Sequence, residues 1–185
     1  MNDQHGSLQA TLVRTAVAML NQGAGEISLR AVARAAGVSA MAPYRHFQDK
    51  VALLQAVADH GFTMLRADLE EADRTADGEE ALIAQGLAYL AFAERHPALF
   101  RLMFASDQKT PRDSGAGRTA YDVLSQRVAD LVPATADTAT LACWALVHGL
   151  ATLALDGQIR SEPAQARAVL RKLVDGLGQD AERPA

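Results

Sequence analysis

Two helix starts lie close together near the beginning of this sequence. In the segment ISLRAVARAAGVSAMAPYRHFQDK, Ser28 and Ser39 each stand where a helix N-cap is expected, and Gly37 lies between them. Ile27 and Val32 have the spacing of a hydrophobic staple around Ser28, and Gly37 falls where a left-handed residue ends a helix. A second short helix must therefore follow the first through a tight turn.

Two short helices joined by a glycine-containing turn form a helix-turn-helix, whose second helix enters the major groove of DNA. Asp49 can cap a further helix over DKVALLQAVADHGFTML, which confines the second helix to about residues 39–47. Pro43 removes an intrahelical hydrogen bond there and predicts a tight or 3₁₀-like start. Because Ala40–Pro43 carry no hydrogen-bonding side chain, we expect this turn to read groove shape and thymine methyl groups.

The rest of the chain is typical of an all-α protein. Hydrophobic residues make up 49% of the 185 residues, recur at helical spacing and form no strand-like runs. The pattern predicts a first helix capped by Ser7, then helices over about 80–95, after Pro97, and over about 119–131, 138–155 and 163–177. We expect a helix-turn-helix domain over 1–55, a helical ligand-binding and dimerisation domain over 56–178, and a disordered tail over 179–185.

Charge and cysteine content exclude several classes of protein. The net charge is −4, yet the first 60 residues hold five bases and four acids, so the acidic excess lies in the remainder. Cys143 is the single cysteine, which excludes an intramolecular disulfide and fits a reduced, cytoplasmic setting. The polar N-terminus does not resemble a signal peptide. No acid/base or metal constellation accompanies Cys143, so we expect neither an enzyme nor a cofactor.

Thr138–Leu155 holds no Asp, Glu, Lys or Arg over eighteen residues. That length could in principle span a bilayer. Three threonines, several alanines and His148 lie inside it, so we interpret it instead as a helix buried on all sides.

The segment SLRAVARAAGVSAMAPYRHFQDKVALLQAV resembles the DNA-binding domain of TetR-type bacterial transcription regulators. The shared skeleton is Ala-x-x-Ala-Gly-Val-Ser, then Tyr-x-His-Phe, then a lysine and a leucine-rich helix, over about residues 8–55. Downstream, HPALFRLMF and CWALVHGLATLALDG resemble one C-terminal subgroup of that family, named for its Trp…His-Gly. The glycine that is common in the family at the position of Met41 is absent here.

The resemblance and the residue chemistry together suggest a set of DNA contacts. Tyr44 and Lys50 suit phosphate, the N-terminus that begins at Ser39 could hold another phosphate, and Arg30 matches a family position that can reach a guanine edge. The expected set is Ser28, Arg30, Ser39, Ala40, Met41, Ala42, Tyr44, Arg45, His46 and Lys50.

The sequence of the C-terminal half predicts functional residues less specifically. Trp144 and His148 lie four residues apart on one helical face, which fits a ligand pocket, a dimer contact, or a core pair with His148 bonded to backbone; we favour the core pair or dimer packing. The residues large enough to line an apolar ligand cavity are Tyr89, Phe92, Phe100, Met103, Phe104, Trp144 and His148, any of which could equally be core. The small residues Ala142, Ala145, Gly149 and Thr152 recur at a spacing that favours a dimer interface.

We therefore expect a homodimeric DNA-binding regulator, a repressor that a small apolar or amphipathic ligand releases from a pseudo-palindromic operator. The alternative is a helical dimer that senses a ligand or a protein partner and binds DNA weakly or not at all. The weak positive charge of residues 1–60 and the bare turn Ala40–Pro43 motivate that alternative.

Overall fold

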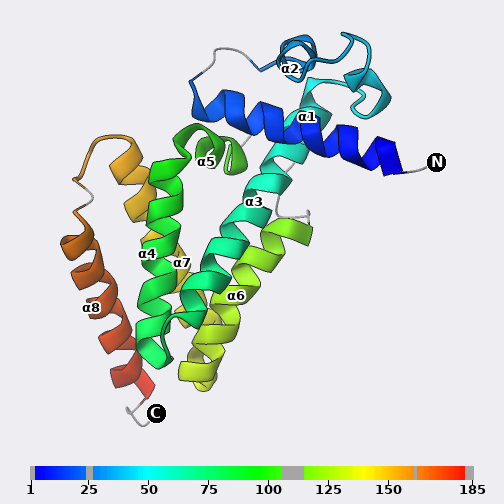
Figure 1. Ribbon diagram of the computed structural model, residues 1–185. Coiled ribbons are helices and arrows are strands. Elements are labelled where there is room, and N and C mark those ends of the chain that lie inside the picture. The colour runs from blue at the N-terminus through cyan, green and yellow to red at the C-terminus, as the bar shows by residue number, and fades with distance from the viewer. Residues whose placement is uncertain (1–2, 24–26, 106–114, 161, 182–185) are drawn as a thin grey trace. The chain divides into compact units, whose positions relative to one another are not determined.

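The computed structural model describes residues 3–23, 27–105, 115–160 and 162–181, with side chains from residue 8 to residue 177 apart from 115–119. Within these ranges every regular element is a helix, so the all-α prediction is confirmed (Figure 1). The elements are α1 (Asp3–Asn21), α2 (Leu29–Ala35), the 3₁₀ helix η1 (Pro43–Arg45), α3 (Lys50–Arg74), α4 (Gly78–Arg95), α5 (Pro97–Met103), α6 (Gly115–Leu131), the 3₁₀ helix η3 (Pro133–Thr135), α7 (Ala136–Leu155) and α8 (Pro163–Ala181).

The chain forms two compact units, and each is made of two separate stretches of sequence. The first unit comprises Met1–Phe62 with His96–Gly117, and the second comprises Thr63–Arg95 with Arg118–Ala185. The short helix α5 therefore groups with the N-terminal elements. The division into functional domains at residues 55 and 56 stays a prediction.

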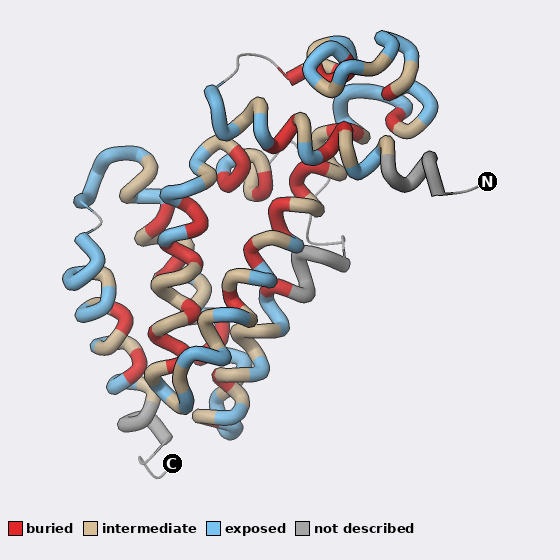
Figure 2. Tube along the Cα trace, viewed as in Figure 1, coloured by how far each residue is buried: buried red, intermediate tan, exposed pale blue. Residues whose placement is uncertain are grey.

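In the first unit, α1 packs on α2 and on α5. Its buried residues, among them Leu12 and Ala16, lie along one side of the helix, while the other side is exposed (Figure 2). Gly61 allows α3 to approach α5 closely, because a Cβ there would lie 2.6 Å from the Sδ atom of Met103. Helix α5 thus contacts both α1 and α3 in this unit.

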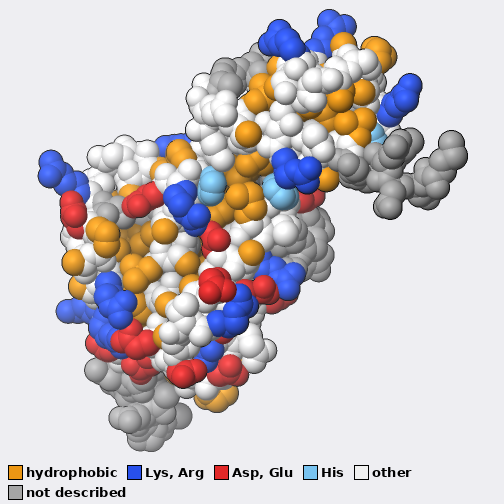
Figure 3. Space-filling view, viewed as in Figure 1, with side chains coloured by type: hydrophobic (Ala, Val, Ile, Leu, Met, Phe, Trp, Pro, Cys, Tyr) orange, Lys and Arg blue, Asp and Glu red, His pale blue; other side chains and the backbone are white. Residues whose placement is uncertain are grey.

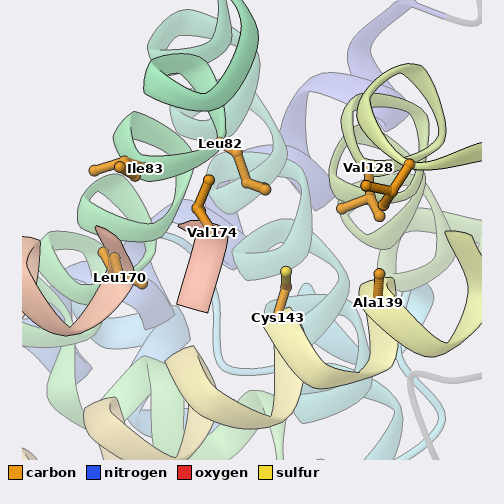
Figure 4. Packing of buried hydrophobic residues seen from close by; sticks show 8 residues of the cluster. Leu82, Ile83, Val128, Ala139, Cys143, Leu170 and Val174 are labelled. Carbon is orange, nitrogen blue, oxygen red and sulfur yellow. The ribbon is translucent and has the colours of Figure 1, made fainter. Parts of the chain in front are cut away.

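In the second unit, one apolar cluster joins α4, α6, α7 and α8 (Figure 4). Its buried members are Leu82, Ile83, Val128, Val132, Ala139, Cys143, Leu170 and Val174. Gly86 lets α8 approach α4 closely, since a Cβ there would lie 2.8 Å from Leu170. Outside this cluster, Arg167 and Arg171 of α8 pair with Glu80 and Glu79 at the start of α4.

A polar network crosses three helices of the second unit. Asp73 in the last turn of α3 accepts two hydrogen bonds from Arg127 of α6, at 2.8 and 3.0 Å, and one from Gln85 of α4 at 2.7 Å. Gln85 is buried, and its Oε1 atom is the one buried side-chain polar atom of the described residues with no hydrogen-bond partner. Sequence analysis missed this network.

Three predicted helix boundaries or environments were wrong. The first helix begins at Asp3 rather than at a Ser7 cap. Helix α8 continues to Ala181, so residues 179–181 of the expected disordered tail are helical, while 182–185 lie outside the described residues. The helix over Thr138–Leu155 is not buried on all sides, since Leu141 is 55% and Leu153 40% exposed.

By length and composition alone, Pro133–Leu155 could also cross a membrane, with a mean hydropathy of 1.6. This is weak support for a membrane span, because core helices of globular proteins meet the same criterion. Only 28% of its most apolar window is buried inside the single chain. The segment therefore carries more apolar surface than its own chain covers.

Candidate nucleic-acid interface

The first helix of the pair is fixed at both ends as its sequence predicts. Ser28 caps α2 by accepting a 3.2 Å hydrogen bond from the Ala31 amide on its Oγ atom. At the other end, Gly37 has φ +69°, and its amide donates to the Arg34 carbonyl while the Val38 amide donates to the Ala33 carbonyl. These two bonds form a Schellman motif, which turns the chain sharply at Gly37.

The second element of the pair is not the two-turn α-helix that the sequence predicts. Ser39 does not cap it: its carbonyl accepts from the Ala42 amide in a turn, and the regular element is the three-residue 3₁₀ helix η1, whose N-cap is Ala42. Pro43 explains the difference because it has no amide to donate to the Ser39 carbonyl. The predicted 3₁₀-like start is thus confirmed, and it extends over the whole element.

This geometry also weakens the expected phosphate site at the helix N-terminus. The first residue of η1 is Pro43, which has no N–H, and the Ala42 amide before it already bonds to Ser39. A three-residue element also contributes little dipole. A phosphate bound by this segment would therefore need side-chain donors.

The third element begins as predicted. The Asp49 carboxylate accepts a 2.8 Å hydrogen bond from the Ala52 amide and caps α3. This cap sets Lys50 on the first turn of α3, where its side chain is exposed. Phe47 and Pro43 are buried and hold the connecting segment against the rest of the unit.

Most of the predicted DNA contacts are exposed around this segment. Met41 is 67% and Tyr44 43% exposed; Arg30, Ser39, Ala40, Arg45 and Lys50 are exposed as well, and Ser28, Ala42 and His46 are partly buried. Val51, which the predicted set does not include, is also 59% exposed beside Lys50.

The exposed charges of this segment are mostly basic. Arg30, Arg34, Arg45 and Lys50 are exposed against one exposed acid, Asp49. Figure 3 shows Lys and Arg side chains standing out from the unit that carries α2 and η1. The net charge of the whole chain therefore hides a locally basic surface, which suits a polyanion.

The predicted ligand residues fall into two groups, one in each unit. In the first unit, Phe104 packs on Phe62 and Phe100, with ring centroids 5.4 and 4.9 Å apart, and Phe100 and Met103 are buried. In the second unit, Phe92 is buried in α4. Each group is therefore described within its own unit.

Tyr89, Trp144 and His148 do meet in the second unit. The Tyr89 hydroxyl lies 2.9 Å from Nδ1 of His148, a side-chain contact that sequence analysis did not predict. The Trp144 ring lies 6.0 Å from the His148 ring and 5.9 Å from Tyr121 of α6, which sequence analysis missed. Burial lowers the pKa of His148 and raises the pKa of Tyr89, against an opposing hydrogen bond from Trp144.

The predicted dimer residues lie on the uncovered side of α7. Ala145 and Thr152 are exposed, and Ala142 and Gly149 are partly buried. A Cβ added to Gly149 would meet nothing within 4 Å. The small side chains therefore do not serve close packing inside the single chain.

The chemistry of the described residues contains no metal or nucleophile site. Among the ranges given above, no three His, Cys, Asp or Glu side chains could hold a metal ion together. Cys143 is buried, and burial raises the pKa of its thiol to about 11, so it stays protonated at neutral pH.

The tight turn at Gly37, the exposed turn before η1 and the basic surface define a helix-turn-helix DNA-binding protein. Residues 12–57 match the family model described as bacterial regulatory proteins, tetR family, and residues 82–177 match the tetracyclin repressor-like C-terminal domain. The chain belongs to the TetR family of DNA-binding transcription regulators, a family without enzymatic activity.

One relative matches part of the chain. The nucleoid occlusion factor SlmA of Aliivibrio fischeri (strain MJ11) is 36% identical over 87 residues, which are 45% of this chain and 43% of that protein. The chain thus matches less than half the length of this relative.

Solved structures match over nearly the whole chain. A protein of unknown function from Rhodococcus sp. RHA1 is 32% identical, covers 97% of this chain and 98% of its own, and has a TM-score of 0.77. The TetR family repressor AlkX from Dietzia sp. strain DQ12-45-1b is 18% identical, covers 92% and 95%, and has a TM-score of 0.60, which shows a shared fold.

Proposed function

We propose that this regulator is a repressor that binds a pseudo-palindromic operator as a homodimer and leaves it when a small apolar or amphipathic molecule binds. The proposed DNA contacts are supported by the exposed surface around the Gly37 turn. Met41, Tyr44, Arg30 and Lys50 are all exposed there. A protein that acts on bacterial DNA in this way works in the cytoplasm.

Each contact has a chemical role. Tyr44 and Lys50 bind phosphates and fix the register, since phosphate contacts position a protein on the duplex without reading sequence. Arg30 donates to a guanine edge, and Ala40 with Met41 packs on thymine methyl groups. Because η1 has three residues, the surface that reads bases is short, and groove shape contributes to specificity.

The uncovered face of α7 supports the homodimer. In a two-fold interface each patch meets its own copy, so a charged residue near the axis would face a like charge. Helix α7 has no charged residue from Thr138 to Leu155, and its outer face presents Leu141 and Ala145. Two copies of this uncharged face can therefore pack on each other without charge repulsion, and we propose a second copy as its partner.

Release by a ligand is a shift of population between conformers. A ligand that binds one conformer better favours it, and repression ends when the two recognition elements no longer match major grooves about 34–36 Å apart. The aromatic group of Tyr89, Trp144 and His148 is the ligand-contacting set that we favour. Trp144, His148 and Gly149 also support membership of the Trp…His-Gly subgroup.

The test is salt-dependent binding to the DNA upstream of the regulator's own gene. Lys50→Ala should weaken binding to all sequences alike and lower the slope of log K against log salt by about one unit, because one phosphate contact is lost. Lys172→Ala, which removes an exposed lysine of α8, is the matched control and should leave the slope unchanged. No binding to any upstream DNA would refute the operator function, and an unchanged slope would remove Lys50 from the interface.

A further inference from the structure

Gln85 on α4 holds a buried hydrogen-bond acceptor that nothing in the described part of the chain uses. The side chain is 2% exposed, and its Oε1 atom has no hydrogen-bond partner among the described residues. Leaving a buried carbonyl oxygen unpaired costs free energy, because the atom loses its bonds to water on folding. Such an atom calls for an explanation, and a bound molecule that donates to it is one.

The neighbouring carboxylate fixes which end of the Gln85 amide is unpaired. The Nε2 atom of Gln85 donates a 2.7 Å hydrogen bond to Asp73. Hydrogen bonds from Arg127 hold the pKa of Asp73 below its usual value, so this carboxyl is ionised at neutral pH. An ionised carboxylate only accepts hydrogen bonds, and exchanging the two ends of the amide would set one oxygen against another. The carbonyl oxygen is therefore the end that is left for another donor.

The charges beside Gln85 balance one another. Arg127 donates to both oxygens of Asp73, at 2.8 and 3.0 Å, and no donor of its guanidinium bonds to Oε1 of Gln85. Because this pair is neutral as a whole, a ligand cation at Oε1 would be buried without a counter-ion. A neutral N–H or O–H group suits the amide oxygen instead. The side chains of Arg127 and Asp73 are 19% and 27% exposed, so the network also reaches solvent.

The unused acceptor lies one helical turn from the aromatic group of Tyr89, Trp144 and His148. Gln85 and Tyr89 are four residues apart on α4 and therefore share a face of that helix. Tyr89 meets His148, which lies beside Trp144 on α7. Ligand sites combine apolar and aromatic surface with a few polar groups that fix orientation. A small molecule whose apolar body packs on these rings can thus present a polar atom to Gln85.

We propose that Oε1 of Gln85 is the polar contact for the ligand: it accepts one hydrogen bond from a neutral N–H or O–H group of a small, otherwise apolar molecule. The proposal rests on the ligand-released repressor proposed above and specifies the chemistry of its ligand. Alcohols, phenols and N–H heteroaromatic compounds meet the requirement. Hydrocarbons and ethers lack the donor, and amines that are charged at neutral pH bring a charge that the site does not balance.

Three probes of similar shape isolate the donor. Indole carries one N–H donor, N-methylindole has a methyl group in its place, and 3-methylindole has the same added volume but keeps the N–H. Isothermal titration calorimetry on the full chain gives the dissociation constant of each probe for the wild type, Gln85→Met and Gln126→Met. Gln126 is the matched control, because it is an exposed glutamine of α6 that bonds to Asp130.

We expect the wild type to bind indole and 3-methylindole at least about fivefold more tightly than N-methylindole, the preference that one neutral hydrogen bond supplies. Gln126→Met should keep this preference and Gln85→Met should lose it. Equal binding of all three probes, or a preference that survives in Gln85→Met, would overturn the Gln85 contact and leave the ligand-released repressor standing. A wild type that binds none of the probes would overturn the site, whereas operator binding is judged separately by the DNA titration.

A second measurement uses only the wild type and does not depend on the folding of Gln85→Met. The assigned side-chain amide resonances of Gln85 are followed by NMR as each probe is added to saturation. A hydrogen bond at Oε1 should shift them more with indole and 3-methylindole than with N-methylindole. Equal shifts from the three probes would contradict the bond and leave Gln85 outside the ligand site.

Discussion

The ion pair of Asp73 and Arg127 allows a quantitative prediction of stability. It joins the last turn of α3 to α6 through two hydrogen bonds of 2.8 and 3.0 Å, and the side chains are 27% and 19% exposed. Arg127→Met removes both bonds while keeping much of the side-chain volume. Asp73 is then left with the single bond from Gln85.

The expected loss lies between that of a surface pair and that of a buried pair. Exposed pairs contribute about 0.2–1 kcal/mol, and removing one partner of a fully buried pair costs about 3–5 kcal/mol. Because water still reaches about a quarter of Asp73, we expect Arg127→Met to lower the free energy of unfolding by about 2 kcal/mol. In a chain of this length that is a fall of about 4–8 °C in Tm.

The loss should depend on pH in a defined direction. The hydrogen bonds from Arg127, aided by that from Gln85, hold the pKa of Asp73 below its usual value, and burial opposes them. A group with a lowered pKa in the folded state contributes stability above its unfolded pKa, about 3.9 for Asp, and loses it as pH falls through the folded pKa. The gap between wild type and Arg127→Met should therefore be full near neutral pH and narrow below about pH 4.

The assay is urea unfolding at fixed protein concentration, because subunit association would itself shift the midpoint. Wild type, Arg127→Met, Asp73→Asn and the double variant form a double-mutant cycle. A coupling energy of about 1–2 kcal/mol is expected for groups in such direct contact. A coupling energy near zero, or a gap that stays constant down to about pH 3, would refute this account of the network.

Three further predictions concern the interface residues. Gly149→Leu should fold but give single chains that no longer bind operator DNA, because a Cβ at 149 meets nothing within the chain; a stable dimer in sedimentation would place the interface elsewhere. Gly37→Ala should lower the free energy of unfolding by about 1–2 kcal/mol in urea titrations, because φ is +69° at this position. The added Cβ would meet no other atom within 4 Å, so backbone strain alone is tested. An unchanged unfolding midpoint would show that alanine is not strained there. Replacing the operator thymines opposite Ala40–Ala42 by uracil removes only methyl groups and should weaken binding by a measurable fraction of a kcal/mol; equal affinities in binding titrations would leave groove shape as the source of specificity.

The local features of this fold could be read from the sequence because they depend on close neighbours. The caps at Ser28 and Asp49 bond to amides three residues away, and the turn at Gly37 depends on bonds within six residues. Pro43 likewise gave the 3₁₀ start from its own chemistry. The length of the second element was overpredicted, because the sequence predicts Ser39 as its N-cap, whereas in the structure the Ser39 carbonyl accepts from the Ala42 amide in a turn before η1.

The long-range contacts could not be read in this way. Asp73 meets Arg127 from 54 residues away, and Tyr89 meets His148 from 59 residues away. Each of these residues has an ordinary place on an amphipathic helix, and no spacing rule links residues on different helices. For the same reason the sequence could not separate aromatic residues that fill the core, such as Phe92, from those that reach a half-covered site, such as Trp144.

In the proposed homodimer, helix α7 would connect the assembly of this regulator to its reading of DNA. Ala139, Cys143, Val147 and Ala151 recur every four residues and face the core of their own unit, while Leu141 and Ala145 face away. Both faces are apolar, so the helix shows little amphipathic contrast. One chain offers only a short recognition element and a few exposed bases, which suits weak, largely unspecific binding to a half-site. In the proposed homodimer, joining two chains through α7 would make the second half-site contact intramolecular and raise the overall affinity. A ligand that changed the packing of the α7 face would then change the occupancy of the operator.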